Sequence, residues 1–456
     1  MQQAGTGTLG VGLERGEARC RSRRFDGVAA LVIGLAVSLH IAALTSLELG
    51  FLNPFFNDAE NRLGRGADFF AVYQAGHNFL SGVSVYTPGA EAVPYAYPFR
   101  YLPFMAVLPG AIANLLPPWP AYWGWVAFVE ALLAINVLLT WRFAPDRRTA
   151  VAGATMWLLF TPFYLELFMG QFSFVMATLF FWLGLGLHLD RRLHSLTAWT
   201  VSVLTKGMSL LFLPLLWKQG WSKLAIAALA VLAALNLPYF LLVRGSWETW
   251  SSNFRSVEGE TAFDPHAGNL GLASLMHLPE TYGGGTALET GLTWLTGTPW
   301  PLLFLLVAGA VTLLASRRQP LRLLALWTCT YFLVFGEVWE HHYVMLLPVL
   351  VLLVLFDDTL RVPAFVAYVF VALPTPYALF QTSVPTLDYH LYDPQAYWSS
   401  IEVYAQHLSK VVPTLLLWLL LSVHLAKGDK ASVTANAKVT LRHAGSRLRH
   451  TSFVAR

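Results

Sequence analysis

The sequence predicts an all-α polytopic membrane protein, and both its composition and its hydropathy pattern support this prediction. Of the 456 residues, 56% are hydrophobic and 12% are charged, whereas a soluble domain carries about 25% charged residues. Apolar runs long enough to cross a bilayer recur along the chain and alternate with polar loops. We therefore expect a bundle of roughly 10–12 transmembrane or re-entrant helices with large extracytoplasmic loops.

The bundle is expected to occupy residues 28–426, between two basic tails. Residues 1–27 carry several arginines beside the first apolar run, which places this tail in the cytoplasm by the positive-inside rule. Residues 427–456 form a second basic tail, which we expect to be cytoplasmic and disordered. The first run, about 28–51, is interpreted as a retained span because many spans follow and no small-residue cleavage site is evident.

Charge and cysteine usage exclude some classes of function. The net charge of +4 does not indicate a nucleic-acid partner, because the basic residues lie in short loops and tails between spans. Cys20 lies in the N-terminal tail and Cys329 lies inside an apolar run. Since they are expected at different levels of the structure, we predict neither a disulfide nor cysteine chemistry.

The first outer loop, 53–97, contains a short helix that begins at Asp68. The apolar residues that follow recur at helical spacing and form one face: Phe69, Val72, Tyr73, Gly76, Phe79 and Leu80. We expect this helix to lie flat at the membrane interface, with its polar edge turned to a cavity. Asp68 either only caps the helix, since an acid in the first turn satisfies free N–H groups, or also serves as a catalytic base.

Residues 98–141 contain two apolar runs whose topology the sequence leaves open. Two full crossings would place the basic loop 142–148 outside the membrane, against the positive-inside rule. The alternative is that the proline-rich run 98–116 enters and leaves on one side, lining a cavity within the protein.

The run 196–217 is predicted to be a re-entrant or broken helix pair. Both of its ends are basic, and the break at Thr205-Lys206-Gly207 leaves two halves that are each too short to cross. We expect Lys206 to point into the protein. Two further outer loops are 244–300 and 381–410, and the remaining spans are 150–168, 172–189, 224–242, 301–316, 323–335, 344–356, 363–380 and 411–426.

The polar cluster Glu340-His341-His342 lies at the outer end of a span. Ionisable groups near a membrane usually face a cavity or a partner, although the flanking Trp339 and Tyr343 also fit an interfacial aromatic belt. Adjacent histidines on a helix point in different directions, so we predict no metal site.

Two cations and two amides are further candidates on the same side of the membrane. Lys206 either snorkels to the interface or holds an anion, and Arg100 is a second candidate for an anion. Gln171 and Asn269 map to the outer surface. The sequence contains no Walker loop, no dinucleotide fingerprint and no nucleophile elbow, so we predict no cofactor. Asp357-Asp358, on the cytoplasmic side, is expected to be a solvated turn.

The order of these motifs resembles that of glycosyltransferase family 87. The outer loop Gly66-Ala67-Asp68-Phe69…Tyr73…Gly76 is similar to the first extracytoplasmic loop of this family. Tyr97-Pro98, Gly170-Gln171, Lys206 and His341-His342-Tyr343 follow in the family's order, so that the resemblance covers about residues 28–380. These proteins are polytopic GT-C enzymes that use polyprenyl-phosphate sugars.

The resemblance implies a GT-C-like bundle that transfers a hexose, mannose in the familiar examples, from a polyprenyl phosphate to a lipid or glycan acceptor with inversion. It implies that Asp68 is the general base. His341, His342, Lys206 and Arg100 would hold the donor phosphate. The residues expected to bind substrate are Tyr73, Gln171, Asn269 and Glu340. The enzyme would lie in the plasma membrane, with its site on the extracytoplasmic face.

Other classes of function remain open at this point. A lipid or glycan transporter or flippase would explain the broken helices and the buried Lys206. A glycan ligase or polymerase would also have large outer loops, and a purely structural membrane protein is the third possibility.

Overall fold

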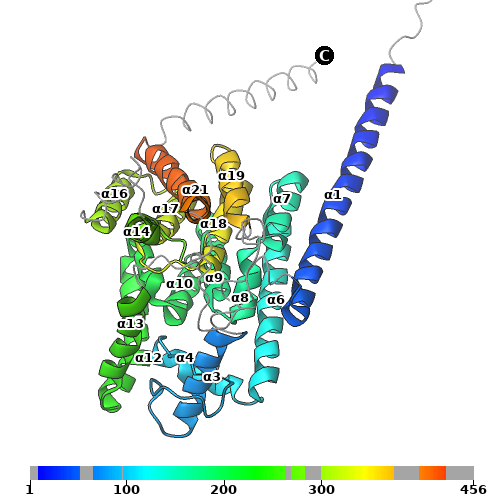
Figure 1. The fold of residues 1–456 in the computed structure, drawn as a ribbon. Coiled ribbons are helices and arrows are strands. Elements are labelled where there is room, and N and C mark those ends of the chain that lie inside the picture. The colour runs from blue at the N-terminus through cyan, green and yellow to red at the C-terminus, as the bar shows by residue number, and fades with distance from the viewer. Residues whose placement is uncertain are drawn as a thin grey trace, which may run out of the picture.

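The regular structure of this protein is helical throughout the part of the chain that the structure describes. The computed structural model describes residues 9–51, 65–94, 96–261, 269–282, 299–373 and 400–427. Within these ranges the elements are helices, with one isolated β-bridge between Asn269 and Trp339. The predicted all-α fold is confirmed, and Figure 1 shows the helices gathered into one bundle.

Several helices can cross a bilayer, so the chain is a multi-pass membrane protein. By length and composition the spans are the Gly27–Leu49 part of α1 (Leu9–Leu49), α6 (Pro118–Phe143), α12 (Ser222–Leu242) and the Val403–Ala426 part of α21 (Ser400–Ala426). The helices α7 (Arg147–Leu158) and α8 (Pro162–Met169) are long and apolar enough together to make a fifth span, although they meet at a bend of 43°.

The remaining apolar helices are shorter, and most of them pack inside the bundle. They are α4 (Pro103–Met105) with η1 (Ala106–Gly110) and α5 (Ala111–Ala113), α9 (Ser173–His188), η2 (Gly207–Phe212) with α11 (Leu213–Lys218), α16 (Trp300–Leu314), α17 (Pro320–Val334), η3 (Glu340–Met345) with α18 (Leu347–Phe356), and α19 (Arg361–Ala372). Several runs that the sequence predicts as spans, such as 172–189 and 301–316, therefore form helices of 16 and 15 residues, which are shorter than the four or five candidate spans.

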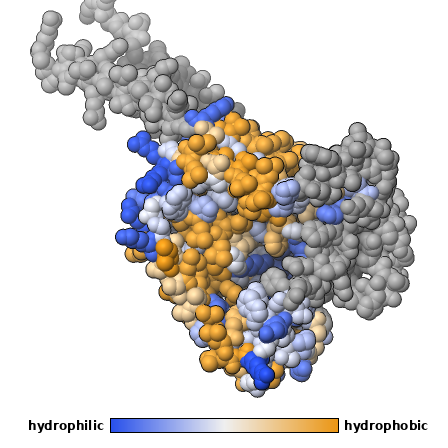
Figure 2. Space-filling model, turned by 90° about the vertical axis from the view of Figure 1, so that its left-hand side faces the viewer, coloured by the Kyte–Doolittle hydropathy of each residue, from blue (hydrophilic) through white to orange (hydrophobic). Residues whose placement is uncertain are grey.

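The outer surface of the bundle suits contact with lipid. Side chains of α1, α6, α12 and α16 leave large apolar groups exposed, among them Leu35, Leu138 and Leu242. Figure 2 shows hydrophobic side chains covering much of one flank, with hydrophilic ones gathered toward the edges. A soluble protein rarely exposes so much contiguous apolar surface, and a bilayer would cover it.

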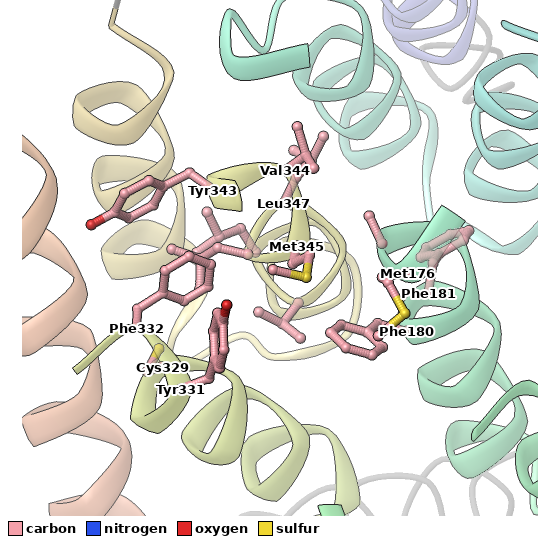
Figure 3. Packing of buried hydrophobic residues seen from close by; sticks show 14 of the residues in the cluster. Met176, Phe180, Phe181, Cys329, Tyr331, Phe332, Tyr343, Val344, Met345 and Leu347 are labelled. Carbon is pink, nitrogen blue, oxygen red and sulfur yellow. The ribbon is translucent and has the colours of Figure 1, made fainter. Parts of the chain in front are cut away.

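The core is formed where α9, α17 and the η3–α18 segment meet. The ring of Tyr343 stacks on that of Phe332, with centroids 4.7 Å apart, and its hydroxyl donates to the Leu270 carbonyl oxygen at 2.9 Å. Figure 3 shows Met345 between the Phe332 ring and the side chains of Phe180 and Met176 on α9, whereas the Tyr343 ring points away from Met345. Because Tyr343 is fully buried, it belongs to the core and not to an interfacial aromatic belt.

The lengths and ends of the helices bear on the topology of residues 98–116 and 196–217. The continuous helical stretch Pro103–Ala113 is 11 residues, about 16 Å, which is half of a bilayer core of ~30 Å. Its length favours the alternative in which residues 98–116 enter and leave on one side. The predicted break in 196–217 is confirmed, because α10 (Arg192–Thr205) ends at Lys206, whose backbone is extended.

The helix that begins beside Asp68, α3 (Ala67–Leu80), lies at the end of the bundle where α6 begins (Figure 1). It crosses η1 so closely that a Cβ on Gly76 would overlap the backbone carbonyl of Gly110. Residues 67–76 are all buried against η1, α6 and α8, and only Phe79 and Leu80 at the end of the helix are exposed. Burial over these residues therefore includes the polar edge of the helix, with Asp68 and Gln74, as well as its apolar face.

The loop predicted over 244–300 contains two helices, α13 (Ser246–Thr261) and α14 (Leu272–Tyr282). The Asn253 amide on α13 donates to the carbonyl oxygens of Tyr86 and Phe99 at 3.2 and 3.1 Å, which ties this helix to the 85–101 segment. The predicted loop 381–410 lies outside the described residues up to 399, and residues 400–410 are the first turns of α21. Most of the C-terminal tail also lies outside them, whereas α1 extends back into the N-terminal tail as far as Leu9.

The acidic pair Asp357-Asp358, between α18 and α19, is only partly a solvated turn. Asp358 is exposed, as expected, but Asp357 is buried and pairs with the Arg322 guanidinium, with Nη2 and Oδ1 3.0 Å apart. Asp357 also accepts the backbone N–H groups of Thr359 and Leu360 at 3.1 Å. It therefore fixes the connection between α18 and α19.

Candidate functional site

Asp68 lies in the first turn of α3 and is 9% exposed. The helix is preceded by Gly66, which adopts a left-handed conformation (φ +79°) and donates its N–H to the Phe168 carbonyl oxygen of α8 at 2.8 Å. No side chain caps the helix at Gly66. The Asp68 carboxyl is thus placed between α3 and the end of α8, where an N-cap function does not account for it.

Burial makes Asp68 an unusually weak acid. It raises the pKa of the Asp68 carboxyl from its usual 3.8 to about 6, because the ionised form loses contact with water. The positive charges of Lys206 and Arg100 and the amide of Gln171 oppose this change but do not cancel it. A carboxylate with a pKa near 6 is ionised at neutral pH and accepts a proton more readily than an exposed aspartate.

The turn that follows α8 brings Gln171 and Lys206 together. Gly170 has a φ of +64°, and a Cβ there would lie 2.6 Å from the Phe69 Cβ, so glycine allows α8 to end against α3. The Lys206 ammonium donates to Gln171 Oε1 at 3.0 Å and to Ser173 Oγ at 2.9 Å. Lys206 therefore points into the protein, as predicted, and does not snorkel to an interface.

Arg100 approaches the same place from the segment between α3 and α4. Its Nε donates to the Asn253 carbonyl oxygen at 3.0 Å, and its guanidinium lies 5.6 Å from the centre of the Tyr97 ring. Burial and the charge of Asp68 raise the pKa of the Tyr97 hydroxyl, which stays a neutral phenol at physiological pH. The Tyr101 hydroxyl donates to Gln171 Oε1 at 3.2 Å and joins the two parts of the site.

The two histidines lie on η3 and are both buried. Their rings are 4.5 Å apart and inclined at 75°, and the charge of Lys206 acts on both of them. His342 Nδ1 accepts the backbone N–H of Trp339 at 3.3 Å. The Nε2 of His341 is buried and has no hydrogen-bond partner among the described residues.

Asn269 and Glu340 support η3 more than they face an open site. The Asn269 amide donates to the Gly336 carbonyl oxygen at 3.0 Å, and its oxygen accepts the Val338 N–H at 3.0 Å. The Glu340 carboxylate lies 3.1 Å from the Lys410 ammonium of α21, and both side chains are buried. These contacts hold the segment that carries His341.

Tyr73 is also engaged in packing. It lies on α3 five residues after Asp68, is 5% exposed, and its hydroxyl donates to the Leu116 carbonyl oxygen at 2.8 Å. The structure thus brings together Asp68, Arg100, Gln171, Lys206, His341 and His342, and it gives Tyr73, Asn269 and Glu340 contacts that support the fold around them.

The sequence prediction missed one acidic residue of the site, Glu166. This residue lies on α8 with no exposed surface, and its carboxyl accepts the Phe174 N–H at the start of α9. Lys206 and Asp68 both act electrostatically on this carboxyl. The available signal was an acid inside the otherwise apolar run 162–169, which ordinarily marks a functional or paired group.

An apolar groove of about 560 Å³ lies between α19 and α21. Phe370 and Leu373 line it on one side, and Leu408 and Ser409 line it on the other. Next to Ser409, the Lys410 ammonium donates to the Leu373 carbonyl oxygen and pairs with Glu340, the neighbour of His341. One end of the groove therefore lies close to the histidine pair.

Comparison with known proteins identifies a family. No curated protein matches the chain. The sequence model of glycosyltransferase family 87 matches residues 95–336, a stretch that contains Arg100, Gln171 and Lys206 and lies between Asp68 and His341. Since this match covers more than half of the chain, the chain belongs to glycosyltransferase family 87 and is a membrane glycosyltransferase.

Proposed function

We propose that this protein transfers a hexose, with mannose the expected sugar, from a polyprenyl-phosphate donor to a lipid or glycan acceptor. One observation carries the proposal: a buried carboxyl, Asp68, lies within the electrostatic reach of two cations, Lys206 and Arg100. Such a site offers a base to an acceptor hydroxyl and positive charge to a phosphate leaving group. Family membership supports the sugar transfer itself.

In the proposed reaction, the acceptor oxygen attacks the anomeric carbon while Asp68 takes the hydroxyl proton. The new bond joins the acceptor oxygen to the sugar, and the bond between the anomeric carbon and the phosphate oxygen breaks with its electron pair on the phosphate. A single displacement of this kind inverts the anomeric carbon. Base catalysis by a positioned carboxylate contributes about 10²–10⁴-fold.

The leaving polyprenyl phosphate gains negative charge and needs no proton. Lys206 and Arg100 would hold this charge, together with N–H groups of His341 and His342. The unpartnered Nε2 of His341 supports such a role. We propose that the groove between α19 and α21 takes part of the polyprenyl chain, because it is apolar and one end lies near the histidines.

We also propose that the site faces the extracytoplasmic side of the plasma membrane and that both termini are cytoplasmic. The arginine-rich connections at residues 142–148 and 317–322 support this orientation, since basic residues favour the cytoplasmic side. Asp68 lies outside the candidate spans, in the segment between the first two of them.

The test uses the purified full chain in detergent with polyprenyl-phospho-mannose and a panel of lipid and glycan acceptors. We expect sugar release from the lipid carrier by the wild type and its loss in Asp68→Asn. Asp358→Asn is the matched control, because it makes the same chemical change at an exposed carboxylate at the other end of the bundle.

Three other outcomes would contradict parts of the proposal. Turnover that survives in Asp68→Asn would move the base to another acid, with Asp58, also in the predicted outer loop 53–97, and Glu340 next. Lipid movement across liposomes without sugar transfer would support the transporter or flippase alternative. Joining of preformed glycan chains without use of the monosaccharide donor would support a ligase or polymerase.

A further inference from the structure

The turn between α11 and α12 lies against the turn that follows α16. The Lys218 ammonium at the end of α11 donates to the Leu313 carbonyl oxygen of α16 at 2.7 Å. The Gln219 amide donates to the Arg317 carbonyl oxygen at 3.2 Å. A Cβ added to Gly220 would lie 3.8 Å from Arg317 Nη1. Two segments that are distant in the sequence therefore share one small region of the surface.

Four cations gather on these two turns, and we call them the basic cluster: Lys218, Lys223, Arg317 and Arg318. Lys223 and the two arginines are exposed. The Arg318 N–H donates to Ser316 Oγ at 3.2 Å, which helps to fix the second turn. Because an ammonium has three hydrogens, the bond from Lys218 to α16 leaves donors for another acceptor.

Carboxylates are missing from the sequence around both turns. There is no Asp or Glu between residues 191 and 247, or between residues 290 and 336. Among the described residues, no carboxylate forms an ion pair with a member of the basic cluster, whereas the nearby Arg322 pairs with Asp357. Like charges held close together repel one another, so an anionic ligand would stabilise this arrangement.

Large apolar side chains border the basic cluster, and they are exposed as well. Two flank each turn in the sequence: Trp217 and Leu224 on the first, and Leu313 and Leu314 on the second. The candidate span α12 begins at Ser222, so the first turn lies where a membrane helix starts. A ligand that suits this surface carries negative charge beside apolar chains, which is the chemistry of an anionic phospholipid.

We propose that the two turns form a binding site for an anionic phospholipid. The basic cluster would hold the negatively charged headgroup, and the acyl chains would lie along the exposed apolar side chains of α12 and α16. Basic pockets between membrane helices bind anionic headgroups in this way. The inference is independent of the proposed function, because it uses only membrane-embedded helices and none of the residues around Asp68.

The experiment measures lipid binding to the purified full chain in detergent by native mass spectrometry. The probes are phosphatidylglycerol and phosphatidylcholine with the same acyl chains, since these lipids differ in the net charge of the headgroup. We expect the wild type to bind phosphatidylglycerol at least about tenfold more tightly. Arg317→Gln/Arg318→Gln should bind it about tenfold more weakly than the wild type, because each cation contributes up to about 1 kcal/mol.

Three further variants separate charge from structure. Arg317→Lys/Arg318→Lys keeps both charges and should keep the preference for phosphatidylglycerol. Lys223→Gln removes a charge from the other turn and should also weaken binding, and it serves if the double Gln variant does not fold. The matched control is Arg147→Gln/Arg148→Gln at the exposed start of α7, which packs against α1, α6 and α18. This control should bind phosphatidylglycerol as the wild type does.

Several results would overturn the inference. One is equal affinity of the wild type for the two lipids, and another is an equal loss of binding in the α7 control. Unchanged phosphatidylglycerol binding in both Arg317→Gln/Arg318→Gln and Lys223→Gln would also exclude the site. If soluble glycerol phosphate displaced phosphatidylglycerol at equal concentration, the turns would bind an anion and not a lipid.

Discussion

Replacing Asp68 with Asn should remove activity without weakening the fold. The pKa of the buried carboxyl is about 6 instead of 3.8, which at 1.36 kcal/mol per pKa unit corresponds to about 3 kcal/mol. This free energy opposes folding, because the folded protein holds an ionised group that water would solvate better. Asn removes the charge at nearly the same volume, so the free energy of unfolding at pH 7 should rise by up to about 3 kcal/mol.

The pH dependence has a definite sign. An acid with a raised folded-state pKa destabilises the protein fully above pH 6, and this effect disappears as the pH falls toward 3.8. In the wild type, the contribution of Asp68 should therefore raise the free energy of unfolding as the pH falls from 7 to 4. Over the same change, kcat/KM should fall about tenfold per pH unit below 6, because the base becomes protonated. The Asn variant should lack both effects.

The assay combines sugar transfer with thermal unfolding followed by the fluorescence of the 17 tryptophans. Asp358→Asn is the control and should change neither quantity, since an exposed surface substitution is usually within about 0.5 kcal/mol. The reasoning would be refuted if Asp68→Asn unfolded at a clearly lower temperature than the wild type. Asp68 would then be a structural residue of α3, and the loss of activity would say nothing about catalysis.

Three further predictions concern other parts of the molecule. Lys206→Met should raise the KM for the polyprenyl-phosphate donor and lower kcat, measured by steady-state transfer, because a cation that faces the leaving phosphate is lost. Gly76→Ala should destabilise the protein by about 1–3 kcal/mol in thermal unfolding, since the added methyl group meets the backbone of Gly110; an unchanged melting temperature would mean that the two segments can separate. Asp357→Ala should cost about 3–5 kcal/mol by leaving the Arg322 guanidinium without its partner, and donor binding by the folded fraction should stay at the wild-type level.

Much of the helical pattern could be predicted because hydropathy and helix breaks are local properties of the chain. The spans α6 and α12 follow from long apolar runs, and the end of α10 at Lys206 follows from a charged residue beside glycine in such a run. The start of α3 near Asp68 follows from the spacing of the apolar residues after it. Each of these features depends on neighbours within a few residues.

The surroundings of individual polar groups could not be predicted in the same way. Asp357 looked like an exposed turn because its partner, Arg322, lies 35 residues away in the chain. Tyr73, Asn269 and Glu340 looked like ligand contacts, but the structure gives their polar atoms partners from distant segments. Glu166 was overlooked because its surroundings form only after α8, α9 and α10 have packed together, which brings Lys206 to the turn between α8 and α9.

The sequence by itself determined that this chain is a membrane-embedded helical bundle, since long apolar runs are stable only when lipid or a protein core covers them. It also determined membership of family 87, because the residues that identify the family lie in short, contiguous motifs. Only the tertiary structure decided which charges share the buried site. An acid or a lysine in an apolar environment is stable only beside compensating groups, and here these groups come from α3, α8 and the break after α10. Their arrangement is a consequence of packing, and local sequence carries no record of it.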